Sequence, residues 1–87
     1  VEVDAGAERA LTDRPTSLLP AGVVSVRGDF VSGDVVDVVG PSGRPFARGL
    51  VAVDGVMLRS VVGRHTSELP AGVTHEVVHR DDLVVLP

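Results

Sequence analysis

The sequence predicts a mainly β fold with two short α-helices, in which a small sheet closes or nearly closes on itself. Valine is abundant and aromatic residues make up only 2% of the chain, and small branched side chains suit a pleated sheet better than a helix. Ten glycines and six prolines separate short alternating apolar segments. So many valines leave no obvious face for solvent, which favours closure. Valine is expected to supply most of the core, at Val23, Val24, Val35, Val36, Val38, Val39, Val61, Val62, Val84 and Val85.

The length of 87 residues indicates one domain, which buries roughly 60–65% of the surface of its unfolded chain. Cysteine is absent, so no disulfide or thiolate metal site is available. No apolar run approaches the ~18–20 residues of a membrane-spanning helix, so no membrane association is expected. The chain begins with Val1 inside an expected strand and without an initiating methionine, and we expect it to be a piece of a longer protein.

The first residues predict a short strand over 1–3, followed by a short helix that ends at Leu11. Asp4 stands where a helix N-cap belongs, and this role is favoured over that of a catalytic carboxylate. Pro15 follows once the helix has ended.

The stretch 17–36 predicts a tight bend, a strand, a glycine turn and the start of a second strand. Pro20 presets the bend and Gly22 can take positive φ, after which Val24 and Val26 should share one face of the strand. The residue pattern of 14–23 recurs at 64–73, but two copies are too few for a repeat architecture. Similar turns or chance explain the echo.

Turn chemistry continues through Gly33-Asp34, where Asp34 is expected to accept hydrogen bonds from turn amides and not to bind a metal. Phe30 is expected to plug the core. A strand over 35–39, a turn over 40–43 and a strand over 46–53 form the next hairpin. Gly49 within that last strand indicates a bulge or a close approach of another backbone segment.

Asp54 is predicted to cap a second helix over 55–62, which Gly63 ends. Met57 is expected in the core and not as a ligand. The tail predicts two short strands over 76–79 and 83–86, separated by a polar turn over 80–82. The last of these should be buried in the sheet.

No group of residues in the sequence supports catalysis. His79-Arg80-Asp81-Asp82-Leu83 invites comparison with a protein-kinase catalytic loop, but the chain contains no asparagine and no lysine. His65, His75 and His79 are the only possible soft-metal ligands. On a strand, His75 and His79 would each lie about 6.6 Å from Val77 between them, which is too far apart to chelate one ion, so zinc is disfavoured. Ser17 and Ser67 are expected to bond turn amides and not to act as nucleophiles.

Five segments together resemble the PUA domain, in the version carried at the C-terminus of bacterial glutamate 5-kinases. They are Val3-Asp4-Ala5-Gly6-Ala7 running to Leu11, Ser17 to Val23, Val26 to Val36, Ala47 to Leu50, and Glu76 to Val84. The glycine turn with G-x-F-x-x-G-D is the general pattern, whereas the V-D-x-G-A opening and the H-R-D-x-L ending indicate the glutamate 5-kinase version. The chain departs from the family at 70–73.

The resemblance implies that residues 1–87 form a single PUA domain, a β pseudobarrel with two helices. It implies a cytoplasmic parent enzyme that uses ATP and Mg²⁺ to phosphorylate the γ-carboxylate of glutamate, the first step toward proline. That chemistry belongs to an amino-acid-kinase domain outside this chain, so no cofactor is expected here. The chain would be a non-catalytic accessory module that contacts its own kinase domain and tunes assembly or regulation.

The family also includes domains that bind structured RNA through the first helix, the glycine turn and neighbouring strands. Carried over by position, that surface would consist of Arg9, Arg14, Pro20, Ala21, Gly22, Arg27 and Arg80. The net charge of −4, the lack of lysine and the lack of exposed aromatic residues favour the accessory role over RNA binding. A free-standing enzyme is a remote third alternative.

Overall fold

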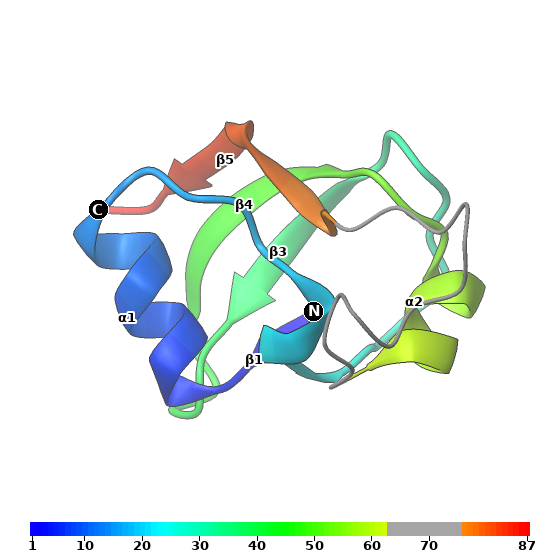
Figure 1. The fold of residues 1–87 in the computed structure, drawn as a ribbon, viewed down its shortest axis with the longest axis horizontal. Coiled ribbons are helices and arrows are strands. Elements are labelled where there is room, and N and C mark those ends of the chain that lie inside the picture. Colours follow the sequence, from blue (N-terminus) through cyan, green and yellow to red (C-terminus); the bar gives the residue numbers. More distant parts are fainter. Residues whose placement is uncertain (63–75) are drawn as a thin grey trace.

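The structure is a computed structural model that describes residues 1–62 and 76–87 (Figure 1). Its elements are β1 (Glu2–Val3), α1 (Ala5–Asp13), the 3₁₀ turn η1 (Pro20–Gly22), β2 (Val23–Ser25), β3 (Val35–Val39), β4 (Pro45–Val51), α2 (Gly55–Val61) and β5 (Val78–Val85). The predicted mainly β fold with two helices is confirmed. Several predictions lie outside the described residues, namely those on Gly63, His65, Ser67, His75, the 64–73 echo and the 70–73 segment.

The strands form one five-stranded sheet in the order β2-β1-β3-β4-β5. Neighbouring strands are antiparallel except β1 and β3, which are parallel. The Val1 amino group donates to the Asp37 carbonyl oxygen at 2.9 Å, and partial burial lowers the pKa of this amine. An isolated bridge between Leu18 and Val78 joins β5 to the segment that leads into β2, so the sheet curls back toward its other edge.

The core lies inside the curled sheet, and α1 and α2 lie at opposite ends of the long axis of the molecule (Figure 1). The buried apolar side chains are Val3, Leu11, Leu18, Val23, Val38, Ala47, Val51, Val53, Leu58, Val61, Val77 and Val78. Phe30 is partly buried against this cluster, as predicted. Leucines from both helices and from the segment before η1 complete a core that valine alone does not fill.

Local turn and cap predictions are confirmed at several positions. The Asp4 carboxylate accepts a hydrogen bond from the Ala7 amide at 2.7 Å, which satisfies a donor of the first helical turn. The Asp34 carboxylate accepts from the Val31 amide at 3.0 Å. Asp54 holds the N-cap position of α2, but its carboxylate accepts from the Ser32 amide at 2.8 Å and makes no bond to the helix.

Gly22 does not use the positive φ that glycine allows; in the described residues positive φ occurs at Gly28, Gly33 and Gly43. Gly22 instead ends η1, and a Cβ at this position would lie 2.8 Å from the Ala7 Cβ. Glycine is needed here because α1 packs closely, and not because the backbone is left-handed.

Predictions of side-chain direction were wrong for several apolar residues. Val24 is exposed while Val23 is buried, so β2 turns the neighbouring valine inward. Val35, Val84 and Val85 are also exposed, against the expectation of a core role. Met57 is 39% exposed, because α2 buries Leu58 and Val61 and turns Met57 outward.

The tail forms one eight-residue strand, β5, and not two strands separated by a turn. The polar residues Arg80, Asp81 and Asp82 lie within β5, where the register with β4 shifts between Gly49 and Val51. The predicted close approach at Gly49 is confirmed, since a Cβ there would lie 2.6 Å from the Asp82 carbonyl oxygen. The irregular register absorbs the polar residues without ending the strand.

Candidate interaction surface

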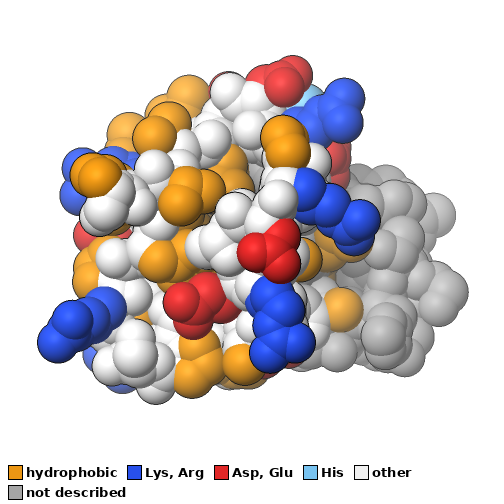
Figure 2. All heavy atoms as spheres, turned by 90° about the vertical axis from the view of Figure 1, so that its left-hand side faces the viewer, with side chains coloured by type: hydrophobic (Ala, Val, Ile, Leu, Met, Phe, Trp, Pro, Cys, Tyr) orange, Lys and Arg blue, Asp and Glu red, His pale blue; other side chains and the backbone are white. Residues whose placement is uncertain are grey.

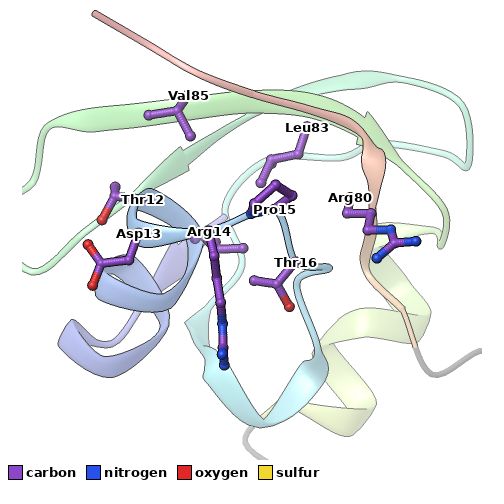
Figure 3. Close-up of a pocket in the computed structure, with 9 residues that line it drawn as sticks. Thr12, Asp13, Arg14, Pro15, Thr16, Arg80, Leu83 and Val85 are labelled. Carbon is purple, nitrogen blue, oxygen red and sulfur yellow. The ribbon is translucent and has the colours of Figure 1, made fainter.

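A hollow of about 300 Å³ lies between the end of α1 and β5 (Figure 3). Its lining residues are Leu11, Thr12, Asp13, Arg14, Pro15, Thr16, Arg80, Leu83 and Val85. Leu11 supplies buried apolar surface, and the threonines, Asp13 and the two arginines supply the polar part of the lining. Figure 3 shows that the guanidinium groups of Arg14 and Arg80 lie well apart, with Thr16 between them in this view.

The end of α1 shapes this hollow. The Thr12 hydroxyl donates to the Glu8 and Arg9 carbonyl oxygens at 3.0 and 3.1 Å, so it is engaged by its own helix. Arg14 follows in an extended conformation as the C-cap, and Pro15 prevents the helix from continuing. The chain therefore turns sharply away from α1 and leaves Arg14 exposed at the mouth of the hollow.

Ser17 joins the segment after α1 to β5. Its hydroxyl donates to the Glu76 carboxylate at 2.5 Å and accepts from the Arg80 backbone amide at 3.1 Å. The bond to a backbone amide was predicted, although the amide belongs to β5 and not to a turn. His79 Nε2 lies 3.9 Å from the same Glu76 oxygen, while His79 Nδ1 accepts from the Asp81 amide. The hydroxyl therefore faces a carboxylate and not the imidazole that would serve as its base in a nucleophilic site.

A second hollow of about 300 Å³ lies between α1 and η1. Its lining residues are Asp4, Ala7, Ala10, Leu11, Thr16, Ser17, Leu18, Leu19, Ala21 and Gly22. Small side chains on both elements let the backbones approach, and this explains why the alanines of α1 face Gly22. The hollow adjoins the one beside β5, because Leu11 and Thr16 line both.

The residues predicted for RNA contact do not form one cluster. Arg14 and Arg80 line the first hollow, and Ala21 and Gly22 line the second. Arg27 lies elsewhere, in a hollow of about 120 Å³ lined by Val1, Glu2, Val39 and Gly43. Pro20 is buried, and Arg9 is exposed on α1. On the side that carries α1, acidic and apolar side chains separate the basic ones (Figure 2).

Sequence reasoning missed most of the lining of the first hollow, including Thr12, Thr16 and Leu83. These residues become neighbours only when β5 docks beside the segment that follows α1, and no local motif marks that contact. Within residues 1–62 and 76–87, no group of three or more His, Asp or Glu side chains is placed to hold a metal ion. The same residues contain no helix with the length and apolar character needed to cross a membrane.

The curled five-stranded sheet with two helices is the fold of solved PUA domains, and the chain belongs to the PUA domain family. The sequence pattern of that family matches residues 1–73. Among solved structures, the fold is similar to a PUA domain from Aeropyrum pernix K1, crystallised as a tartrate complex, with a TM-score of 0.66 and 33% identity over 92% of this chain and 41% of that one. A conserved PUA domain protein from Thermoplasma acidophilum shares the fold with a TM-score of 0.63 and 24% identity, over 91% of this chain and 46% of that one.

Three curated relatives that match nearly the whole chain are glutamate 5-kinases. The protein from Rhodococcus opacus (strain B4) is 50% identical over 86 residues, which is 99% of this chain and 24% of that protein. The protein from Frankia casuarinae is 50% identical over 90 residues, with the same coverage of both chains. The protein from Mycobacterium tuberculosis (strain ATCC 25177 / H37Ra) is 49% identical over 84 residues, covering 97% of this chain and 22% of that protein. The chain spans about a quarter of the length of the curated relatives it matches.

Proposed function

We propose that this chain is the C-terminal PUA domain of a glutamate 5-kinase, and that it acts as a non-catalytic accessory module of that enzyme. The observation that carries the proposal is 50% identity to a glutamate 5-kinase over 99% of the chain. The match to the general family pattern stops at residue 73, whereas the match to glutamate 5-kinase includes β5. The likeness is therefore to this version of the domain and not only to PUA domains in general.

In the proposed enzyme the phosphoryl transfer takes place outside this chain. An amino-acid-kinase domain binds ATP, Mg²⁺ and glutamate in the cytoplasm, and the PUA domain changes how that domain assembles or is regulated. The arrangement at Ser17 supports a non-catalytic role, because its hydroxyl is tied to Glu76 and to the Arg80 amide.

The test compares the full-length protein with a version that lacks residues 1–87 of this sequence. We expect glutamate-dependent consumption of ATP in both, with a change in Mg²⁺ dependence, proline sensitivity or oligomeric state when the domain is removed. Absence of glutamate-dependent activity in the full-length protein would reject the kinase assignment. Identical behaviour of the two proteins in all three respects would reject the accessory role.

RNA binding is a second candidate function, favoured by the position of Arg14 and Arg80 beside one hollow. Against it stand the net charge of −4 and the separation of the basic side chains (Figure 2). If structured RNA binds here, tRNA-like duplexes should show an affinity that falls steeply with salt. Arg14→Ala should weaken binding and flatten the salt dependence, whereas Arg44→Ala, at the turn between β3 and β4, should not. No binding at low salt would exclude this function.

A further inference from the structure

The outer face of the sheet over β3, β4 and β5 carries large apolar side chains although it lies in solvent. Val35 of β3 is 62% exposed, Leu50 of β4 is 43% exposed, and Val84 of β5 is 64% exposed. The pairing register places Val35 opposite Leu50, and Arg48 of β4 opposite Val84. Since alternate residues of a strand point to the same side, these side chains share one face, which we call the outer sheet face.

The polar groups at the centre of this face neutralise each other. Arg48 Nε lies 2.8 Å from Asp37 Oδ1, and the two residues are direct partners on β4 and β3. Both side chains are about half exposed. A pair that already satisfies its own charge and geometry can be covered at a smaller desolvation cost than a single charge.

An antiparallel sheet with one face in water normally alternates apolar residues inward with polar residues outward. Here β3 has the sequence Val35-Val36-Asp37-Val38-Val39, so Asp37 is its only polar side chain. Val36 and Val38 point inward and pack in the core, whereas Val35 points outward and exposes an apolar side chain to solvent. The composition of the outer sheet face is that of a surface which another protein surface covers.

We propose that the outer sheet face is the docking surface for the amino-acid-kinase domain of the same enzyme. This inference rests on the proposed function. About three quarters of each glutamate 5-kinase relative lies outside the matched region, so a large partner is covalently attached to the domain in those proteins. In the proposed enzyme the kinase domain precedes Val1, and the Val1 nitrogen lies 2.9 Å from the Asp37 carbonyl oxygen. The connection therefore reaches the domain beside β3, the strand that carries Val35 and Asp37.

Cysteine labelling of the full-length protein tests the contact, because residues 1–87 contain no cysteine of their own. The variants are Leu50→Cys and Val84→Cys, with Val24→Cys as the matched control. Val24 is 52% exposed, which lies between the values for Leu50 and Val84, and it is located on β2 at the opposite edge of the sheet from β5. Maleimide labelling rates are followed by peptide mass spectrometry and normalised to the rate of each variant in denaturant.

If the proposal is correct, Leu50→Cys and Val84→Cys label at least about tenfold more slowly than Val24→Cys, a factor of ten in exposure corresponding to ~1.4 kcal/mol. A photoreactive cross-linker at Leu50→Cys should then capture peptides from outside residues 1–87. Equal labelling of all three variants would overturn the proposal. Cross-links only to residues 1–87 of another copy would also overturn it, because a second copy would then cover the face.

The labelling result is separate from the enzymatic one. A full-length protein without glutamate-dependent activity would reject the proposed function, whereas the labelling ratios still report whether the rest of the polypeptide covers the outer sheet face.

Discussion

Replacing Gly49 by alanine should destabilise the domain, because Gly49 lies where β4 and β5 come into close contact. An added Cβ would lie 2.6 Å from the Asp82 carbonyl oxygen, 2.7 Å from Val78 Cγ1 and 3.3 Å from Leu83 Cα. Two of these three atoms belong to backbone, which cannot rotate away as the end of a flexible side chain can. Relief of the clash therefore requires β5 to move relative to β4.

The expected loss combines two opposing effects. Overpacking of this kind costs about 1–3 kcal/mol, while replacing glycine in a strand by alanine returns about 0.5–1 kcal/mol of conformational entropy. Because two of the contacts are with backbone atoms, the overpacking cost should lie in the upper part of its range, at about 2–3 kcal/mol. After a gain of about 1 kcal/mol in conformational entropy, the net change for Gly49→Ala is a destabilisation of about 1–2 kcal/mol. For a domain of this size, each kcal/mol lowers Tm by about 4–8 °C, so the expected shift is about 5–15 °C.

Thermal unfolding followed by far-ultraviolet circular dichroism measures this shift, since the chain has no tryptophan or tyrosine to report by fluorescence. Gly6→Ala is the matched control, because its new Cβ would lie 3.4 Å from Asp4 Oδ1 and clash with nothing. In a helix this substitution should stabilise by about 0.5 kcal/mol or more. A Gly49→Ala protein with Tm within about 2 °C of the parent would refute the close contact.

Three other substitutions test separate contacts. Gly22→Ala should cost about 1–3 kcal/mol because its Cβ would lie 2.8 Å from the Ala7 Cβ, and adding Ala7→Gly should restore part of the loss in a double-mutant cycle measured in urea; strict additivity would contradict the contact. Leu58→Ala should lower the free energy of unfolding by about 2–5 kcal/mol, since Leu58 is fully buried, and an unchanged urea midpoint would show that α2 does not pack on the core. Asp4→Ala should cost about 0.5–2 kcal/mol through the lost cap at the Ala7 amide, with Asp4→Asn expected to retain most of the stability in the same assay.

Features set by neighbours in the sequence could be predicted. Asp4 finds its hydrogen-bond donor three residues away, and Asp34 does the same at Val31. Both predictions need only the local geometry of a helix start or a turn. The need for glycine at position 49 was also evident, because a glycine within an apolar strand pattern marks a close approach.

Features set by distant pairing could not be predicted from local pattern. The register between β4 and β5 shifts between Gly49 and Val51, and this shift decides which residues of β5 face solvent. Val84 therefore lies outside the core although its neighbours are apolar. The hollow beside α1 has the same origin, since Thr16 and Leu83 meet only through the docking of β5.

The bridge at Leu18 also ties the segment that follows α1 to the chain at the start of β5. Leu18 donates to the Val78 carbonyl oxygen at 2.9 Å and accepts from the Val77 amide at 2.7 Å, while β1 secures the other end of the helical segment against β2 and β3. The chain on each side of α1 is thus held by backbone hydrogen bonds to the sheet. A ligand or partner that binds to α1 meets a platform that is already in place and loses little binding energy to ordering it.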